Sequence, residues 1–388
     1  MYNYVRRIVN KGSYLKVKKF IRYVFLIGIE PTFMKVIAHQ KTKNKGLPLT
    51  KTLSLNNTGY KSPRKKYGII GCGNYAFSIA SYFINKFKPR SISGVYDPNG
   101  SNSINLAKWF KADFVYHDPA DLIKSRDIDM IFICSNHFSH ADYAIKSINA
   151  GKAVHIEKPH VSNFKQLKLL IHTMNQNPLV PVFLGFNRPR TFLYNKLISY
   201  VNKENGPSFI NWFIAGHQLD SDHWYFQPNE GGRIIGNICH WTDLSLRMVG
   251  IDNAFPIKIN TIKSEISESD FSITILFGDG SIATISFSAK NYLFEGVRDH
   301  LNLHKGNLLA YLKDFQYLEI CNGSRNHKYR TMFKSLGHGE NIKNSLFSQK
   351  GESVNFVQAS GLLFLAAKKS IDENRTIEIK ENTIDSII

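Results

Sequence analysis

Between Tyr67 and Phe186, short apolar runs alternate with stretches that have helical periodicity. The apolar runs read YGIIG, SISGVYD, DMIFICS, AVHIEKP and VPVFLGF, and predicted helices lie between them, among them residues 103–110, 140–150 and 163–174. Strands separated by helices of this length imply a parallel, doubly wound sheet. This pattern constrains the fold of the chain more than any other feature.

The first strand leads directly into GCGNYA at residues 71–76, at the head of a predicted helix. Gly71 permits a tight turn, Gly73 lets the backbone approach a pyrophosphate, and the small Ala76 allows the helix to pack closely on the strand. The helix N-terminus offers free N–H groups and partial positive charge to phosphates. The pattern predicts a Rossmann dinucleotide-binding domain over residues 67–184.

Asp97 ends the next strand, about 20 residues further on, where a carboxylate can accept hydrogen bonds from an adenosine ribose. A carboxylate there repels a 2′-phosphate, and no arginine follows closely. The sequence therefore favours NAD over NADP. The alternative is that Asp97 is only a turn residue before Pro98.

Two further polar segments follow predicted parallel strands, SNHFSH at residues 135–140 and EKP at residues 157–159. Ligands of open α/β sheets bind at the carboxyl ends of strands. Both positions suit a nicotinamide site.

After Phe186 the pattern changes to a helix at residues 191–201, a strand at residues 208–215 and a helix after Gly236. Strand-like runs follow from residue 257 to residue 320, with a Gly-Asp-Gly turn at residues 278–280. Consecutive strands with short turns indicate a mainly antiparallel sheet. We expect an α/β domain with an open sheet over residues 185–388.

The net charge of +20 is concentrated at the start of the chain. Residues 1–66 carry 16 Lys and Arg against Glu30 alone, whereas the remainder carries 34 against 29 acids. Residues 4–40 read as two amphipathic helices with Pro31 between them or in the second, and residues 41–66 read as a linker. The extension packs on the protein itself or on a partner subunit, or it attaches to an anionic membrane surface. Nucleic-acid binding is disfavoured, since no recognised module accompanies the charge.

The apolar run from Tyr23 to Ile29 is much shorter than the roughly 18 to 20 residues that cross a bilayer. Basic residues interrupt it, so a signal peptide is not expected. The four cysteines, at positions 72, 134, 239 and 321, form no CxxC pair. Their spacing argues against disulfides or a structural metal site and favours a cytoplasmic protein. We also allow for a location at the inner face of the membrane.

The motifs, in their order and spacing, resemble the glucose-fructose oxidoreductase / inositol dehydrogenase / rhizopine catabolism family, over about four-fifths of the chain. The resemblance rests on the segments already quoted together with AGKAVHIEKP at residues 150–159, GFNRPR at 185–190 and GGRIIGNICHWTD at 231–243. It is similar in particular to a subgroup with a GRIIG segment. The family implies a substrate domain whose open sheet often forms an oligomer interface, so a homo-oligomer is expected.

The resemblance assigns catalysis to Lys158 and His240, which in family members lie beside the nicotinamide and the reacting carbon. Removing a hydroxyl proton needs a base tuned toward neutrality, so we expect the pKa of Lys158 to be lowered by burial or by the oxidised nicotinamide. Cofactor contacts are expected from Gly71, Gly73, Asn74, Tyr75, Ala76, Asp97, Ser135, Asn136, His140 and Glu157. Substrate contacts are expected from Asn187, Arg188, Trp224, Asn237 and Asp243. Trp224 either stacks on a sugar or base or belongs to the core.

One departure from the family pattern concerns the helix that carries His240. Many relatives have aspartate four residues before the histidine, and the GRIIG subgroup has glutamate three residues before it; this chain has Gly236 and Asn237. Asn237, His240 and Asp243 share one helical face, so Asn237 or Asp243 is a candidate to orient the imidazole.

The sequence predicts an oxidoreductase that transfers hydride between NAD and a sugar or nucleotide-sugar hydroxyl, in a role such as surface-polysaccharide biosynthesis. No metal is expected. One alternative is a glycosidase-like enzyme that oxidises its substrate transiently with tightly held NAD. Another is a non-catalytic dinucleotide-binding protein in a membrane-associated assembly.

Overall fold

In the computed structural model, which describes residues 17–44, 46–55, 66–267, 269–291 and 296–387, the apolar runs after Tyr67 form the predicted parallel sheet. Its order is β1-β4-β3-β2-β5-β6-β7, and every pairing is parallel except that of β1 with β4. The strands are β1 (Leu53–Ser54), β2 (Tyr67–Ile70), β3 (Ile92–Tyr96), β4 (Phe114–Val115), β5 (Met130–Ile133), β6 (Ala153–Ile156) and β7 (Val182–Leu184).

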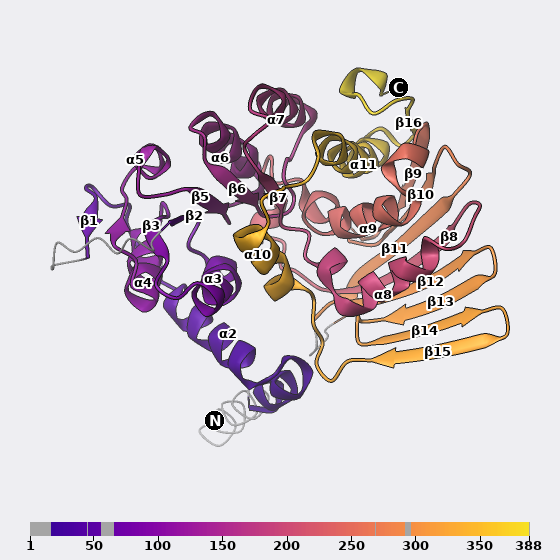
Figure 1. Cartoon of the computed structure of the whole chain (residues 1–388), viewed down its shortest axis with the longest axis horizontal. Coiled ribbons are helices and arrows are strands. Elements are labelled where there is room, and N and C mark those ends of the chain that lie inside the picture. Colours follow the sequence, from indigo (N-terminus) through magenta and orange to yellow (C-terminus); the bar gives the residue numbers. More distant parts are fainter. Residues whose placement is uncertain (1–16, 45, 56–65, 268, 292–295, 388) are drawn as a thin grey trace.

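Helices cover both faces of this sheet (Figure 1). Those of one face are α5 (Pro119–Lys124), α6 (His137–Asn149) and α7 (Phe164–Gln176). Those of the other are α2 (Ile29–Lys41), α3 (Ser81–Phe87), preceded by the π-helical turn η1 (Ala76–Ala80), and α4 (Gly100–Phe110). The Rossmann fold is confirmed. Because β2 lies between β3 and β5, the strand order reverses there, and ligands of such sheets bind at this point.

The second sheet has the order β15-β14-β13-β12-β8-β11-β10-β9-β16 and is antiparallel except for the pair β8 and β11. The prediction of an open, mainly antiparallel sheet is confirmed. Its strands are β8 (Phe209–His217), β9 (Ile257–Lys263), β10 (Phe271–Leu276), β11 (Ile282–Asn291), β12 (Arg298–Lys305), β13 (Leu308–Lys313), β14 (Tyr317–Asn322), β15 (Arg325–Arg330) and β16 (Ile377–Ile379).

Three helices cover one face of this sheet: α8 (Phe192–Val201), α9 (Cys239–Val249) and α11 (Val354–Glu373). Along β8, alternate residues such as Ile210, Trp212 and Ile214 are buried beneath them, while Phe209 and Phe213 on the other face are more than half exposed. This alternation is the signature of a sheet with one covered face. The π-helical turn η4 (Ile234–Ile238) leads into α9, which ends at Gly250 with a φ of 87°.

Two C-terminal helices were missed by the sequence prediction, α10 (His338–Phe347) and α11. Helix α11 is apolar around most of its circumference because it packs against β9, α7 and α9 together, so it lacks the one-sided period that marks a surface helix. Helix α10 returns to the first sheet, where the Asn341 amide donates to the Leu184 carbonyl oxygen at 3.1 Å. The C-terminal part of the chain therefore helps to build the wall of the Rossmann domain.

Within the described part of the N-terminal extension, α2 packs on the Rossmann domain and residues 53–54 form a strand. Helix α2 buries Met34, Ile37 and Ala38 in the same apolar cluster as Ile69 of β2. Pro31 lies in its first turn, as one alternative had it. The prediction of a linker without regular structure over residues 41–66 was wrong for residues 53–54, which form β1. The start of the first predicted helix, before residue 17, and residues 56–65 lie outside the described part.

We predict unequal effects on stability for alanine at the two glycines of the first turn. Gly71 has a φ of 87°, and a Cβ there would lie 2.5 Å from the Ser135 nitrogen, whereas a Cβ on Gly73 would meet nothing within 4 Å. Gly71→Ala should lower the free energy of unfolding by at least about 1–2 kcal/mol, the cost of a left-handed backbone before any clash. Gly73→Ala should change it by less than about 0.5 kcal/mol. Urea unfolding without cofactor measures both, and equal effects would contradict this account of the turn.

Candidate active site

A cavity of about 710 Å³ opens at the carboxyl ends of β2, β3, β5 and β6. It is lined by Ile70, Gly71, Gly73, Asn74, Tyr75, Tyr96, Asp97, Pro98, Cys134, Ser135, Asn136, His137, Ser139, His140, Tyr143, Glu157, Lys158, Trp224 and Tyr225. Nine of the ten predicted cofactor residues are in this wall. Ala76 is not, because it is fully buried under the helix that follows the turn.

The turn after β2 has the shape of a phosphate cradle. The Gly71 backbone passes so close to Cys134 and Ser135 that no side chain fits between them. The space beside Gly73, by contrast, is open and faces the cavity, and helical backbone begins at Asn74. A diphosphate can therefore approach the peptide and receive the N–H groups of the helix N-terminus. The residues present fit a dinucleotide.

Asp97 lies at the end of β3 with its carboxylate fixed in the cavity wall. Its two oxygens accept from the backbone N–H groups of Cys72 at 2.6 Å and Asn99 at 2.7 Å. Burial raises the pKa of Asp97, although these hydrogen bonds oppose the shift. The carboxylate is thus held by the glycine turn itself, at the place where a ribose would lie.

Glu157 anchors the floor of the cavity from the end of β6. Its carboxylate accepts from the Tyr75 hydroxyl, and the His155 Nε2 lies 3.3 Å away. Burial alone would raise the pKa of Glu157, but the hydrogen bonds from His155 and Tyr75 and the positive potential of His155 lower it overall. An ionised carboxylate is therefore kept next to Lys158.

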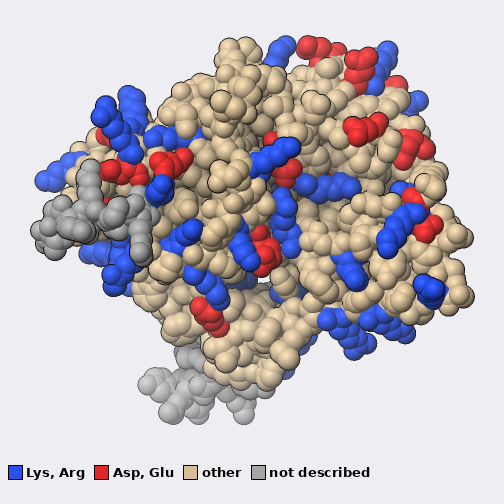
Figure 2. Space-filling view, viewed as in Figure 1, with Lys and Arg blue, Asp and Glu red and all other residues tan. Residues whose placement is uncertain are grey.

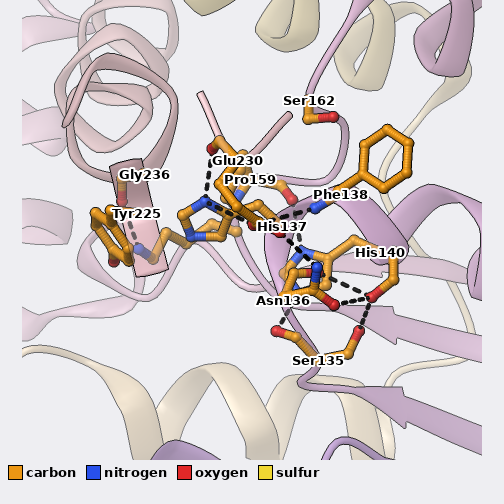
Figure 3. A network of polar contacts seen from close by, with 12 residues as sticks. Ser135, Asn136, His137, Phe138, His140, Pro159, Ser162, Tyr225, Glu230 and Gly236 are labelled. Atoms are coloured by element: carbon orange, nitrogen blue, oxygen red, sulfur yellow. Dashed lines mark hydrogen bonds and ion pairs between the residues drawn. The ribbon is translucent and has the colours of Figure 1, made fainter. Parts of the chain in front are cut away.

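His140 ties the two polar segments of the cavity together. Its Nδ1 lies 2.7 Å from the Pro159 carbonyl oxygen and its Nε2 lies 3.0 Å from the Ser135 carbonyl oxygen. Figure 3 shows this ring between the end of β5 and the segment after β6. The contacts fix the backbone that carries Lys158 relative to Asn136, so His140 positions the wall as well as lining it.

Lys158 carries its ammonium group across to the second domain. Its Nζ donates to the carbonyl oxygen of Gly236, in the π-helical turn η4, at 2.6 Å. Burial lowers the pKa of Lys158, but Tyr225, Cys239 and Glu157 raise it more, so the net shift is upward. The expectation of a lowered pKa was therefore wrong for the protein without cofactor, because the buried charge is paired with an anion and a carbonyl group.

Gly236 leaves no room for the acid that relatives carry at this position. A Cβ there would lie 2.6 Å from Cε2 of Tyr225 and 2.7 Å from Cε1 of His137. The two aromatic rings occupy the space that an aspartate side chain would need. At Gly236, where the sequence departs from the family pattern, the rings of Tyr225 and His137 fill the space instead of an acidic side chain.

Trp224 and Tyr225 form a cover over this end of the cavity. They belong to a short 3-10 helix, η3 (Trp224–Phe226). The Trp224 ring packs edge to face against His137 at a centroid distance of 4.6 Å, and the Tyr225 ring packs against it in a tilted arrangement at 4.7 Å. Trp224 remains 37% exposed, so it is a wall of the cavity and not core. Tyr225 had no signal in the sequence, and His137 was noted only as part of SNHFSH, because the contact between them joins two domains.

Glu230 fastens this cover to the first domain. Its carboxylate accepts from the Asn136 amide at 2.5 Å and from the Phe138 N–H at 3.4 Å, at the start of α6. Its carbonyl oxygen accepts from Nδ1 of His137 at 3.0 Å. Figure 3 shows Glu230 pointing at the N-terminus of α6, where negative charge is favoured. Glu230 was not predicted as a site residue.

His240 lies behind the cavity and is not among its lining residues. It is 6% exposed, its ring is near those of Phe186 and Trp241, and its Nδ1 has no hydrogen-bond partner in the described part of the chain. Burial, followed by the charges of Arg188 and Lys158, lowers the pKa of His240 well below its usual value. The imidazole is therefore neutral at neutral pH and electrostatically coupled to Lys158.

The residues predicted to orient His240 have other partners. Asp243 is fully buried and pairs with Nε of Arg247 at 2.9 Å, against α11. Asn237 accepts from Nη1 of Arg233 at 3.2 Å. Neither makes a hydrogen bond with His240 in the structure described, so this prediction was wrong: α11 pulls the Asp243 face away from the cavity.

Asn187 and Arg188, which the sequence predicted as substrate contacts, do not line the cofactor cavity. The Asn187 amide donates to the Leu336 carbonyl oxygen at 2.5 Å. Arg188 is 5% exposed, pairs with Asp299 at 3.3 Å and lies over the ring of Trp241. Both side chains are held by partners within the second domain. Arg188 contributes positive potential near His240 without reaching the cavity.

A doubly wound sheet with a dinucleotide cradle, joined to an open-sheet domain that covers the cradle, defines a dinucleotide-dependent oxidoreductase. Residues 65–186 match the model of the oxidoreductase family with an NAD-binding Rossmann fold. Over these residues the chain has the cofactor-binding domain of the glucose-fructose oxidoreductase, inositol dehydrogenase and rhizopine catabolism family. It is an NAD-dependent oxidoreductase.

Relatives and solved structures extend the likeness beyond the first domain. The myo-inositol 2-dehydrogenase of Thermotoga maritima is 22% identical over 341 residues, 81% of this chain and 99% of that protein. Oxidoreductase P35 of Formosa agariphila is 26% identical over 229 residues, 56% of this chain and 70% of that protein. A levoglucosan dehydrogenase solved with NADH and levoglucosan superposes with a TM-score of 0.70 at 16% identity, over 82% of this chain and all of that one. The last likeness shows the fold.

We predict that Asp97 sets the preference for NAD. Asp97→Asn removes the negative charge while an amide oxygen can still accept one hydrogen bond, so repulsion of a 2′-phosphate disappears. The ratio of the dissociation constants for NADP and NAD should fall by about tenfold or more, which corresponds to about 1.4 kcal/mol. Fluorescence titration measures both constants. An unchanged ratio would mean that Asp97 only shapes the turn.

We also predict a pH-dependent effect of Asp243→Asn. Burial raises the pKa of Asp243 to about 6. Because a carboxyl in the unfolded chain ionises near pH 4, the folded chain holds a proton that the unfolded chain has lost between about pH 4 and 6. The contribution of Asp243 to stability is therefore present below pH 4 and lost as the pH rises through 6. The free energy of unfolding of Asp243→Asn relative to the parent should rise by about 2–3 kcal/mol from pH 4 to pH 7. A constant difference in urea unfolding would contradict this.

Proposed function

We propose that this oxidoreductase removes hydride from a ring carbinol of a sugar or a related cyclic polyol, with Lys158 at the reacting oxygen. The observation that carries the proposal is the cavity in which the Lys158 side chain and the Gly71–Gly73 turn meet. The names of the relatives support the substrate class, since they include an inositol dehydrogenase and a levoglucosan dehydrogenase. The cofactor cradle alone would not distinguish a sugar from another alcohol.

The chain's own groups suit the removal of a hydroxyl proton. Bound NAD supplies a nicotinamide ring that accepts hydride. The raised pKa of Lys158 keeps an ammonium group in the cavity, where it stabilises the alkoxide that develops as hydride leaves. In this proposal the ammonium group passes a proton toward the neutral His240 and takes up the hydroxyl proton in its place. The rings of Trp224 and Tyr225 exclude water from this end, which strengthens the interaction.

His240 remains our second candidate for the proton path, acting through Lys158. A neutral imidazole can accept a proton, and its coupling to Lys158 supports this role, although its buried position means that it does not line the cofactor cavity. Tyr225 lines that cavity and is coupled to the ammonium group, so we add it as a candidate that the sequence did not suggest.

A nucleotide-activated sugar is our more specific proposal for the substrate. A second cleft, of about 1300 Å³, shares Tyr225 with the cofactor cavity and is lined by side chains that include Phe226, Gln227 and Lys369. It offers room for a substituent much larger than a free monosaccharide, beside aromatic and cationic groups. If the substrate is a nucleotide-activated sugar, we further propose a role in surface-polysaccharide biosynthesis.

Assembly and location are also proposals. The uncovered face of the second sheet exposes Phe209, Phe213 and Leu309, each by more than half, which supports a homo-oligomer through that face. Location at the inner face of the membrane rests on the N-terminal helices.

We predict that Lys158→Ala abolishes turnover while leaving NAD bound. Loss of the ammonium group removes the stabilisation of the developing alkoxide, so kcat for NADH formation should fall by about 10²-fold or more. The assay mixes purified protein with NAD and candidate UDP-sugars, inositols and free sugars, and follows NADH absorbance. NAD affinity is measured separately by fluorescence titration.

Lys146→Ala is the matched control, because Lys146 is an exposed lysine of α6 outside the cavity. It should leave kcat and NAD affinity unchanged. Unchanged turnover in Lys158→Ala would overturn the catalytic assignment. Product release without net NADH would instead favour the glycosidase-like alternative, and NAD binding without turnover of any carbohydrate would favour the non-catalytic one, which Gly236 also motivates.

A further inference from the structure

Helix α2 is apolar on two faces, and the protein covers only one of them. Met34, Ile37 and Ala38 are buried against the Rossmann domain. Phe33 and Val36, on the other side of the same turns, are 56% and 40% exposed. A surface helix normally carries polar residues on its outer face. We therefore expect the outer face of α2 to contact a partner.

The exposed apolar residues continue onto the preceding helix, over residues 17–27. Five side chains spaced by four residues are each at least half exposed, and we call them the apolar stripe: Val17 57%, Ile21 50%, Phe25 77%, Ile29 72% and Phe33 56%. Within each of the two helices, residues four apart lie on one face, and Gly28, with a φ of 93°, separates the helices between Phe25 and Ile29. Figure 2 shows the lobe that these helices form, at the bottom of the view, with few charged side chains on the face seen.

The N-terminal segment that carries the stripe is basic in sequence and has a single acid. Residues 1–66 carry a net charge of +15, and their only acid, Glu30, is paired with Nζ of Lys86 at 3.1 Å. Lys18 and Lys19 are exposed next to Val17. An apolar face with flanking cations is the combination that binds to anionic lipid headgroups and inserts shallowly between them.

We propose that the apolar stripe docks this oxidoreductase on an anionic membrane surface. A second copy of the same face is a poorer partner, because it would bring the exposed Lys18 and Lys19 against the same two residues of the other copy. A nucleic acid would neutralise the basic residues, but it would leave the apolar stripe exposed to water. In the part of the chain that the structure describes, no helix is long and apolar enough to cross a membrane, so the contact is peripheral.

The test uses the full chain, because deleting residues 1–66 would also remove Met34, Ile37 and Ala38 from the core. Sedimentation with phosphatidylcholine vesicles, with and without phosphatidylserine, measures the bound fraction. We expect binding only with phosphatidylserine, and less at high salt. Phe25→Gln/Ile29→Gln should reduce partitioning by about tenfold or more, and Lys18→Gln/Lys19→Gln by a similar factor.

Matched controls remove the same chemistry elsewhere. Leu179→Gln/Met332→Gln replaces two residues that are 93% and 83% exposed outside the stripe, and Lys343→Gln/Lys350→Gln removes two exposed lysines from another surface. Both should bind vesicles like the parent, and NAD affinity should be unchanged in every variant, which confirms folding. The proposal is overturned if the parent binds neither kind of vesicle, or if the Phe25/Ile29 variant binds as well as the parent. It is also overturned if the parent forms oligomers that the stripe variants do not form, and vesicles fail to dissociate those oligomers.

Discussion

The ammonium group of Lys158 is buried between the two domains, and the site depends on how that charge is satisfied. A buried charge is costly unless it has hydrogen bonds and an opposite charge nearby. The Gly236 carbonyl oxygen comes from the second domain and the Glu157 carboxylate from the first. The two domains therefore meet at the end of β6 and the turn before α9, and the cavity next to the glycine turn is defined by that meeting. The Glu230 carboxylate at the start of α6 makes a second such contact.

The charges around the cavity are distributed unevenly. Burial lowers the pKa values of His137, His140 and His240 and brings that of His338 to about 3, so these imidazoles are neutral at neutral pH. Lys158 keeps its charge because its partners outweigh burial. Positive charge in the wall of the cavity is thus concentrated at one atom, in a place where aromatic rings limit the access of water. This arrangement suits an alkoxide that forms at one carbon.

The N-terminal extension combines two roles in one helix. Met34 and Ile37 bind α2 to the Rossmann domain as part of its core, and Ile29 and Phe33 remain outside. The extension is thus a fixed part of the protein surface, so a membrane contact through it would orient the cavity relative to the membrane. A loosely attached tail could not do that.

The sequence by itself determined the features that depend on local patterns. The alternation of strands and helices predicted the Rossmann sheet, and Gly71 and Gly73 predicted the turn. Asp97 and Glu157 marked polar ends of two strands of the same sheet. Each follows from residues close in the chain, because parallel strands bring their carboxyl ends to one edge. The resemblance of the motifs to a known family added Lys158 as a catalytic candidate and suggested the family itself.

Only the tertiary structure decided which groups meet across the domains. Tyr225, His137 and Glu230 converge on the cavity from segments about 90 residues apart, whereas His240, Arg188 and Asp243 lie behind it. Helix α11 draws Asp243 away from His240, and its buried circumference hides its own helical period. Long-range packing leaves no periodic trace in the sequence, so these contacts, and the sign of the pKa shift of Lys158, had to come from the folded chain.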